Sequence, residues 1–444
     1  MSKALVQERI SENSNNRIEV DRVISTAGLD NGKFHIEEFW SAVDSLKNNS
    51  DFKYIRMDFG VPGLKPAVHG IKTHLDILQQ GEISQQYPPY AGVSDLRCSM
   101  SEFISSRLET PFSADDIFVT CGATQALFIA QSITSTLHTT ASSIVFLTPN
   151  YPPMCAQARF LGVDAISIEV DGKRGSKLID EIRNVFEKNT VSALCWASPS
   201  NPGWMILNHE ELASIAALCK EFNVIPIEDL TYLGMIGTDK QNLPDALPSI
   251  AKYIDDYILV LSTSKMLSYA GERIGFMVGS PHLLNTESSK LKQRFGMTSV
   301  RRACGSLIFN LTGGAPHSAQ YAVADVIDSI NRGYYDIDNF LSTYTKRAKK
   351  LSKILSDNGF YLVYSSGIDE DLKGFYVSFG YPGLTELELV KKLLYYGITV
   401  LPLSIFGSDR DDGVRACVGR LGDDQILELE TRISYFAGDH YEKV

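Results

Sequence analysis

The sequence has little of what marks disulfide-rich, metal-binding or membrane proteins. Its seven cysteines are scattered, odd in number and contain no Cys-x-x-Cys pair, so we expect reduced thiols in a cytoplasmic protein. Its eight histidines form no HExxH or comparable spacing, which gives a metal site no support. The start lacks the apolar core of a signal peptide, and apolar runs such as residues 257–261 are far shorter than the ~20 residues that cross a bilayer.

Basic and low-complexity tracts are also missing. The net charge is −11, which argues against a nucleic-acid partner because phosphate backbones are bound by clustered lysine and arginine. One segment, residues 31–38, looks like the second half of a calcium-binding EF-hand loop. That alignment puts Ala27 and Leu29 at positions where calcium requires oxygen ligands, so we expect no calcium site there.

The middle of the chain alternates short β-rich runs with helical stretches, the pattern of an α/β fold with a mostly parallel central sheet between helices. After about residue 315, a long helical region and several short strands predict a smaller α+β domain. The expected organisation is an N-terminal arm with part of the small domain (1–60), a large domain (61–325) and a small C-terminal domain (326–444). The expected strands of the large domain are 144–148, 165–170, 193–197, 224–227, 257–262 and 273–278.

The segment from Ser262 to Gly275 carries the strongest chemical signal. It follows an apolar strand, and in open α/β sheets ligands bind beyond the carboxyl ends of the strands. Arg273 offers a bidentate fork for a phosphate, and Lys265 offers an amine that can condense with a carbonyl group. By itself the segment is equally compatible with a polar turn that carries a solvated lysine.

The pattern Ser-x-x-Lys-x₇-Arg in this segment resembles the cofactor-lysine signature of the aspartate aminotransferase family. These are class I/II enzymes of fold type I that depend on pyridoxal-5′-phosphate (PLP). Further motifs similar to those of the family occur in the same order between Asp58 and Arg415. The resemblance implies the fold type I architecture, PLP as the cofactor and a Schiff base between PLP and Lys265.

The resemblance assigns the PLP phosphate to two segments. Residues 119–126 run from a strand through a glycine turn into a helix, and the N–H groups at a helix N-terminus form a ready anion site. In the family such a turn holds the phosphate. Here this implies that Gly122, Ala123 and Thr124 bind it together with Ser262 and Arg273.

Four further residues are implied to contact the cofactor ring. Tyr151 is implied to stack on the ring. Asn201 is implied to donate to the O3′ oxygen of the cofactor and to bind the substrate. In the turn that contains Asn201, Gly203 directly follows Pro202, which departs from the family pattern. The spacing of Asp229 and Tyr232 implies a carboxylate beneath the pyridine nitrogen, which makes the ring an electron sink, and a hydroxyl at O3′. Glu228 is adjacent, but neighbouring residues of a strand point to opposite faces.

The resemblance also implies a carboxylate site and a dimer. Arg415 matches the arginine that binds the α-carboxylate of the substrate, Gly60 matches a glycine whose backbone meets the same carboxylate, and Arg420 is out of register. Tyr87 matches a tyrosine that reaches the PLP phosphate of the neighbouring subunit, which implies a homodimer with shared active sites. Tyr90 is a second aromatic candidate for the substrate pocket.

The implied function is that of an aminotransferase that moves an amino group between an amino acid and a 2-oxo acid, with Lys265 as base and acid. The same apparatus serves PLP-dependent lyases, cyclases and oxidases, and a binding or regulatory protein of this fold can retain it. The substrate stays open among acidic, aromatic and aliphatic amino acids. Six residues are candidates for its pocket and are equally compatible with ordinary packing: Arg56, Trp196, Trp204, Tyr269, Arg301 and Arg302.

Overall fold

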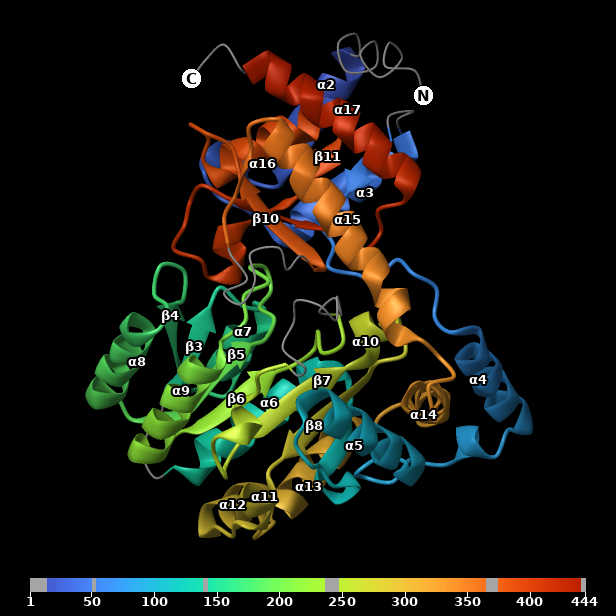
Figure 1. Cartoon of the computed structure of the whole chain (residues 1–444), viewed down its shortest axis with the longest axis vertical. Helices are drawn as coiled ribbons and strands as arrows, with labels where there is room; N and C mark the ends of the chain where they lie inside the picture. Colours follow the sequence, from blue (N-terminus) through green and yellow to red (C-terminus); the bar gives the residue numbers. More distant parts are fainter. Residues whose placement is uncertain (1–13, 50–52, 139–142, 236–246, 365–373, 441–444) are drawn as a thin grey trace. The chain divides into compact units, whose positions relative to one another are not determined.

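A computed structural model describes residues 14–49, 53–138, 143–235, 247–364 and 374–440 of the 444-residue chain (Figure 1). Its contacts divide the chain into two units. Among the described residues, the larger unit comprises 64–343, and the smaller comprises those up to 63 together with 344–364 and 374–440. The division therefore falls after residue 343, whereas the boundary expected after residue 325 lies within a helix.

The larger unit is built around a seven-stranded sheet with the order β2-β8-β7-β6-β5-β3-β4. Within these strands only β8 is antiparallel to its neighbours, so the prediction of a mostly parallel sheet is confirmed. Most strand residues are buried apolar side chains, as expected for a sheet covered on both faces. The strands are β2 (Ile117–Cys121), β3 (Ser143–Thr148), β4 (Asp164–Glu169), β5 (Val191–Ala197), β6 (Ile225–Asp229), β7 (Ile258–Ser262) and β8 (Ile274–Gly279).

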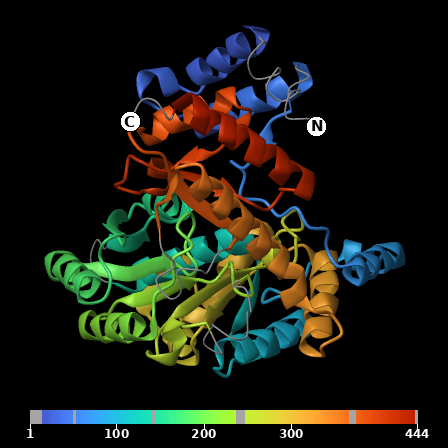
Figure 2. The ribbon, with the colours of Figure 1, turned by 45° about the horizontal axis from the view of Figure 1, so that its top comes forward.

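Helices cover both faces of this sheet (Figures 1 and 2). Helix α6 (Gly122–Leu137) packs on one face, where its apolar residues share a core with strand residues such as Phe146 and Cys195. Helices α8 (Ser176–Lys188) and α9 (His209–Phe222) lie on the other face. The remaining helices are α4 (Val68–Gln80), α5 (Ser94–Leu108), α7 (Pro153–Phe160), α10 (Thr263–Met266), α11 (Pro281–Asn285), α12 (Ser289–Phe295), α13 (Val300–Thr312) and α14 (His317–Asn331).

The smaller unit combines helices with two small sheets, the α+β composition expected for it. One sheet is antiparallel with the order β12-β13-β10-β9, and the other pairs β1 with β11 in parallel. The strands are β1 (Ile55–Arg56), β9 (Tyr361–Leu362), β10 (Tyr376–Gly380), β11 (Ile398–Thr399), β12 (Leu401–Pro402) and β13 (Val414–Cys417). The helices are α2 (Ser14–Thr26), α3 (Ile36–Asn49), α16 (Glu386–Tyr395) and α17 (Asp423–His440), and α15 (Ile337–Asp357) continues into this unit from the larger one.

The segment that looks like a calcium loop forms the short 3₁₀ helix Leu29–Asn31 and then the first turn of α3. Across the residues that the structure describes, no three His, Cys, Asp or Glu side chains gather as a metal site requires. In the same part of the chain, no helix has the length and apolar character needed to cross a bilayer.

Candidate active site

The end of β2 and the start of α6 form a glycine turn in the larger unit. Gly122, at a φ of 73°, is the first residue of α6, and Ala123 and Thr124 follow it in the first helical turn. Gly275 of β8 lies against this turn, because a Cβ at Gly275 would collide with the backbone of Gly122 and Ala123. The first N–H groups of a helix lack intrahelical partners and carry the positive end of the helix dipole. The turn is therefore a site for an anion.

The guanidinium of Arg273 lies directly against this glycine turn. A Cβ at Gly122 would lie 2.3 Å from Arg273 Nη2, so the guanidinium lies in contact with the glycine. Arg273 Nη1 donates to the carbonyl of Ala270 at 2.8 Å and reaches Ser264 Oγ at 3.5 Å. A cation thus adds to the helix N-terminus at one small site, as binding of a phosphate requires.

Ser262 and Lys265 reach the same edge of the sheet from the end of β7. Ser262 Oγ caps α10 by accepting the N–H of Ser264 at 3.1 Å. Thr263 Oγ1 donates to the carbonyl of Ile274 at 2.9 Å, which fixes α10 to β8. Strand β8 pairs with both β2 and β7, so the ends of these two strands lie close together. Lys265, half-buried on α10, belongs to this edge.

Two adjacent carboxylates end β6 and point to opposite faces of the sheet, as strand geometry predicts. Asp229 is buried and accepts from the backbone N–H and the hydroxyl of Thr231 at 2.9 and 2.5 Å. Burial raises the pKa of Asp229 to about 6, although the bonds from Thr231 act to lower it. Glu228 is also buried and accepts from Ser249 Oγ at 2.7 Å and the N–H of Ile250 at 3.0 Å. Burial raises its pKa to about 7.

The turn that follows β5 is tied to the end of β6. The N–H of Ser198 donates to the carbonyl of Asp229 at 2.9 Å, and the N–H of Ser200 donates to the carbonyl of Met205 at 2.8 Å. Asn201 is buried inside this closed turn. Gly203, the residue that departs from the family pattern, lies in a tightly packed part of this turn. A Cβ at Gly203 would lie 3.0 Å from Met205 Cε and 3.1 Å from Ser200 Oγ. The turn thus holds Asn201 beside the strand that carries Asp229.

The four candidate tyrosines differ in their surroundings. Tyr232 is buried, and its ring lies 5.4 Å from the ring of Trp204. Tyr151 follows β3 and is half-buried against the core that α6 shares with the sheet. Tyr87 is 80% exposed, and Tyr90 is exposed with its ring 4.9 Å from that of Phe309. The larger unit therefore buries or half-buries two of the four and leaves Tyr87 and Tyr90 on its surface.

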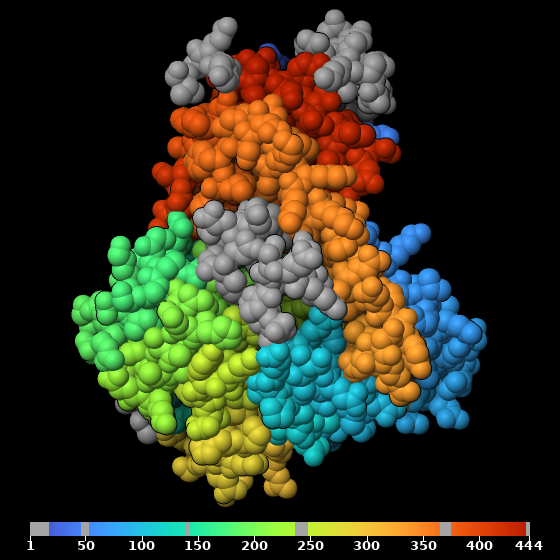
Figure 3. All heavy atoms as spheres, in the orientation of Figure 1, coloured from blue at the N-terminus to red at the C-terminus, as the bar shows by residue number. Residues whose placement is uncertain are grey.

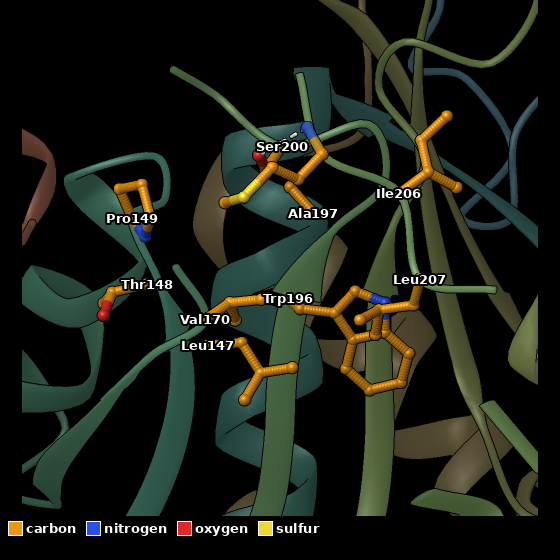
Figure 4. A pocket seen from close by; sticks show the side chains of 10 residues that line it. Leu147, Thr148, Pro149, Val170, Trp196, Ala197, Ser200, Ile206 and Leu207 are labelled. Carbon is orange, nitrogen blue, oxygen red and sulfur yellow. Dashed lines mark hydrogen bonds between the residues drawn. The ribbon is translucent and has the colours of Figure 1, made fainter. Parts of the chain in front are cut away.

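A small apolar pocket lies at the ends of β3 and β5, below the turn that contains Asn201 (Figure 4). The Ser200 hydroxyl accepts the N–H of Met205 at 3.1 Å on its rim. None of its lining residues carries a carboxyl, imidazole, thiol or amino group. The lining residues are Leu147, Thr148, Pro149, Val170, Trp196, Ala197, Ser200, Met205, Ile206 and Leu207.

Arg415 is the centre of a second buried cluster, in the smaller unit. It extends from β13, and its guanidinium lies between the rings of Tyr376 and Phe406, 4.6 and 4.8 Å from their centroids. Arg415 Nη2 donates to the carbonyl of Asp58. A Cβ at Gly60 would lie 2.5 Å from the Tyr376 hydroxyl and 3.4 Å from Arg415 Nη1. Arg415 and the Gly60 backbone are thus neighbours, as a shared carboxylate site requires.

Next to this cluster lies an ion network that the sequence interpretation missed. Arg56 Nε and Nη2 donate to the two carboxylate oxygens of Asp58 at 2.7 and 2.6 Å, and Nη1 donates to Asp44 at 2.6 Å. The hydroxyl of Thr399 also donates to Asp58. The available signal was the spacing of Arg56 and Asp58, which places two opposite charges on one side of an extended segment. The aromatic rings around Arg415 gave no comparable signal.

The aminotransferase class I and II family matches the chain over residues 55–433, a range that includes both clusters. The chain belongs to this family. It is therefore a PLP-dependent aminotransferase, which transfers an amino group between an amino acid and a 2-oxo acid. The predictions of family, reaction and cofactor are confirmed.

Individual relatives of the aminotransferase are distant. It is 25% identical to the putative aminotransferase YugH of Bacillus subtilis over 86% of this chain and 91% of that protein. It is 22% identical to the probable aspartate aminotransferase of Methanocaldococcus jannaschii over 84% of this chain and 91% of that protein. The crystal structure of the aspartate aminotransferase of Thermotoga maritima superposes with a TM-score of 0.74 at 21% identity, over 90% of this chain and 96% of that one. This likeness confirms fold type I.

Proposed function

We propose that the cluster around Lys265 in the larger unit holds PLP and performs the proton transfers of transamination. A single observation carries this proposal. The pairing of β8 with β2 and β7 joins the glycine turn, Arg273 and α10, the helix that bears Lys265, at one edge of the sheet. Ligand sites of α/β enzymes lie at such an edge.

The donors at the glycine turn fit the phosphate of PLP. The helix N-terminus at Gly122, Ala123 and Thr124 offers backbone N–H groups, and Arg273 supplies a positive charge beside them. Ser262 adds a hydroxyl beside them. Because each of these groups donates hydrogen bonds, together they suit a dianion better than any neutral ligand.

Asp229 fits the pyridine nitrogen. Its pKa of about 6 reflects a buried carboxylate whose hydrogen-bond donors are neutral, and a protonated nitrogen would provide the positive partner that stabilises its charged form. When bound, PLP supplies the electron sink that accepts the charge left at the Cα of the substrate. Asn201 and Tyr232 are the candidates to donate to its O3′ oxygen, and Tyr151 is the candidate to stack on its ring.

Lys265 has two tasks in this proposal. It binds the cofactor covalently until an amino acid displaces it, and its Nζ atom then takes a proton from the Cα of the substrate and returns one as acid. Arg415 and the backbone of Gly60 bind the α-carboxylate of the substrate. A planar guanidinium matches a carboxylate with two parallel hydrogen bonds and so fixes the orientation of the bond from Cα to hydrogen.

A transamination assay separates this proposal from the lyase, cyclase and oxidase alternatives. Purified holoenzyme is mixed with single amino acids while the cofactor absorbance and the products are followed. We expect conversion of the cofactor to its amino form with an equivalent of 2-oxo acid. Release of ammonia with the cofactor unchanged, or uptake of oxygen, would contradict transamination, and the absence of any spectral response would favour a binding role.

We also propose a homodimer in which Tyr87 reaches the phosphate site of the neighbouring subunit. Tyr87 is exposed, and four apolar residues form an exposed stripe on α4, at the surface of the larger unit (Figure 3). Exposed apolar patches of this kind are typical of interfaces between proteins. The stripe consists of Val68, Ile71, Leu75 and Leu78.

Subunit complementation tests whether the active sites are shared. The Lys265→Ala and Tyr87→Glu variants should each be inactive, the second because a carboxylate would repel the phosphate of the partner's cofactor. In mixed dimers, one site combines an intact Lys265 with an intact Tyr87 from the other chain. Activity that appears on mixing supports shared sites, and two variants that exchange subunits without regaining activity would contradict them.

We further propose that the enzyme acts in the cytoplasm with amino acids and 2-oxo acids as its small-molecule partners. Cys195, Cys219 and Cys304 are buried as single thiols, and burial raises the pKa of each of them. Such thiols stay protonated and unreactive, which suits a reducing compartment. Fractionation of cells that express the tagged chain tests this assignment.

A further inference from the structure

Trp204 has a backbone conformation that a bulky residue rarely adopts. Its φ is 55°, in the left-handed region, which glycine adopts freely and a residue with a Cβ disfavours. Hydrogen bonds of its own turn hold this conformation. The N–H of Trp204 donates to the carbonyl of Ser200 at 2.9 Å, and the N–H of Ser200 donates to the carbonyl of Met205 at 2.8 Å. A strained residue that its surroundings hold in place indicates a functional constraint.

The ring of Trp204 packs against Tyr232, which belongs to another loop of the larger unit. The two ring centroids lie 5.4 Å apart with 60° between the ring planes, a separation at which tilted aromatic rings attract each other. Trp204 is 3% exposed and Tyr232 is 5% exposed, so both rings lie in the packed interior. Trp204 follows β5 and Tyr232 follows β6, and these two strands are neighbours in the sheet. The contact thus joins the loops after two adjacent strands.

The same two loops carry the residues proposed to donate to the O3′ oxygen of the cofactor. Asn201 lies in the turn that contains Trp204, and Tyr232 lies in the loop after β6. The N–H of Met235 donates to the carbonyl of Tyr232 at 2.9 Å, which fixes the backbone of that loop, whereas the indole of Trp204 lies against the side chain. A hydrogen bond weakens steeply when its donor is misaligned, so a tyrosine hydroxyl is a good donor only if its ring is held.

We propose that Trp204 is a positioning residue for Tyr232, whose ring it holds in the orientation from which the hydroxyl donates to the O3′ oxygen of PLP. The inference rests on the proposed role of Tyr232 as an O3′ donor. Trp204 does not contact the cofactor in this scheme. Its left-handed backbone directs the indole from its own turn to the neighbouring loop.

The test titrates the cofactor absorbance of the holoenzyme in the absence of substrate. The absorbance changes when the nitrogen that joins Lys265 to PLP loses its proton. A hydroxyl that donates to O3′ draws on the negative charge that would otherwise hold this proton, so it lowers the pKa of that nitrogen. Tyr232→Phe removes the hydroxyl. We expect its midpoint to rise by about one to two pH units, the tenfold to hundredfold range for a hydrogen bond to a charged group.

Trp204→Leu removes the indole and leaves the Tyr232 hydroxyl in the chain. We expect its midpoint to rise by about half a pH unit to one pH unit, a three- to tenfold change, because a loosely held hydroxyl is less well aligned. Trp204→Phe keeps an aromatic ring, so its midpoint should lie between those of the wild type and Trp204→Leu.

Trp204→Gly separates the indole from the strained backbone. Glycine adopts a φ of 55° without strain, so this variant keeps the conformation of the turn and loses only the ring. Its midpoint should match that of Trp204→Leu, and it provides the measurement if Trp204→Leu does not fold. A wild-type midpoint in Trp204→Gly would overturn the inference, because the backbone rather than the indole would then be what matters.

The double variant Trp204→Leu/Tyr232→Phe shows whether Trp204 acts through Tyr232. If it does, loss of the indole adds nothing once the hydroxyl is gone, and the midpoint should equal that of Tyr232→Phe. Additive shifts would also overturn the inference, since Trp204 would then act on the cofactor by another route.

Trp196→Leu is the matched control for loss of a buried indole in the same unit. Trp196 is 2% exposed and pairs in register with Glu228, so its side chain lies on the face of the sheet opposite to Asp229. Its variant should unfold at a lower urea concentration and keep the wild-type midpoint. Equal midpoint shifts in Trp196→Leu and Trp204→Leu would mean general loosening of the unit and would refute a specific role of Trp204.

Tyr232→Phe alone distinguishes failure of this inference from failure of the proposed function. If Tyr232→Phe raises the midpoint and Trp204→Leu does not, Tyr232 stands as an O3′ donor and the role of Trp204 is refuted. If Tyr232→Phe leaves the midpoint unchanged, the proposed donor itself is refuted, and the inference about Trp204 falls with it.

Discussion

The two units of this aminotransferase treat buried charge in opposite ways. In the larger unit, the carboxylates of Asp229 and Glu228 accept hydrogen bonds from hydroxyl and amide donors that carry no charge. In the smaller unit, Asp58 is paired with a guanidinium. Burial raises the pKa values of Asp229 and Glu228. Their neutral hydrogen-bond donors compensate only in part for the water that each carboxylate loses on folding.

This difference fits the ligand that each unit is proposed to bind. A cofactor with a positive ring nitrogen supplies the charge that Asp229 lacks. The buried carboxylate of the smaller unit, Asp58, already has a cationic partner in Arg56. We infer that the larger unit keeps a buried carboxylate for a positive ligand, whereas the smaller unit neutralises its own buried carboxylate.

The largest effect is expected from Lys265→Ala. Removal of the amine that is proposed to move the Cα proton should lower the transamination rate by about 10⁴-fold or more. The variant should also give no covalent cofactor adduct on borohydride reduction, as read by mass spectrometry. Lys252→Ala, a change of a half-buried lysine paired with Glu109 in the same unit, should leave both readouts unchanged. A residual adduct at full stoichiometry would exclude Lys265 as the cofactor lysine.

Neutralising Asp229 should have the next largest effect. Asp229→Asn keeps the shape of the side chain but removes the charge that is proposed to hold the ring nitrogen protonated, so kcat should fall about 10²–10³-fold. Glu228→Gln, one residue earlier on the other face of β6, should change kcat little. Single-turnover absorbance measurements on both variants check this contrast. Equal losses would mean that the two carboxylates do not differ in role.

The raised pKa of Glu228 predicts a pH dependence of stability in cofactor-free protein. Folding raises this pKa from 4.5 to about 7, so the folded chain binds the proton more tightly than the unfolded chain does. Stability is then greatest below about pH 4.5 and falls as pH rises to about 7, by about 3 kcal/mol. Urea unfolding between pH 4.5 and 8 measures this loss. In Glu228→Gln the slope should be smaller, and an unchanged slope would assign it to other groups.

The smallest effect is expected from Gly122→Ala. Its methyl group would collide with the Arg273 guanidinium in a backbone that already has a φ of 73°, so cofactor affinity should fall about tenfold, the effect of roughly 1.4 kcal/mol. Gly172→Ala is the matched control, because Gly172 has a φ of 69° with open space around it. Both variants should lose about 1–2 kcal/mol of stability, but only Gly122→Ala should release cofactor, as equilibrium dialysis would measure.

Much of the larger unit could be predicted from sequence because its features are local. Each strand is a short apolar run, and the residues proposed to bind the cofactor stand where a strand ends or a helix begins. Glu228 and Asp229 could be told apart by strand alternation alone. The domain boundary was harder to place, since α14 and α15 form a continuous helical pattern and the contacts divide the chain inside α15.

The environment of Arg415 was largely hidden from the sequence. Asp58, Tyr376 and Phe406 stand in three separate parts of the chain. The Asp58 carbonyl and the two aromatic rings come together around Arg415 only in the folded unit. No periodicity relates residues so far apart. Only the spacing of Arg56 and Asp58 carried a local signal, and it did not reveal that Asp58 also binds Arg415.

The sequence by itself determined the family, the fold class, the cofactor and the candidate lysine, because ordered local motifs are enough to specify strand ends, glycine turns and a helix N-terminus. The tertiary structure alone decided how the charges are balanced. It left Asp229 and Glu228 buried with neutral donors and gave Asp58 a guanidinium, and burial is a property of the whole packed unit rather than of any segment. The energy of a charge inside a protein depends on the groups that surround it in space. Those groups come from several parts of the chain, so no single segment of the sequence specifies them.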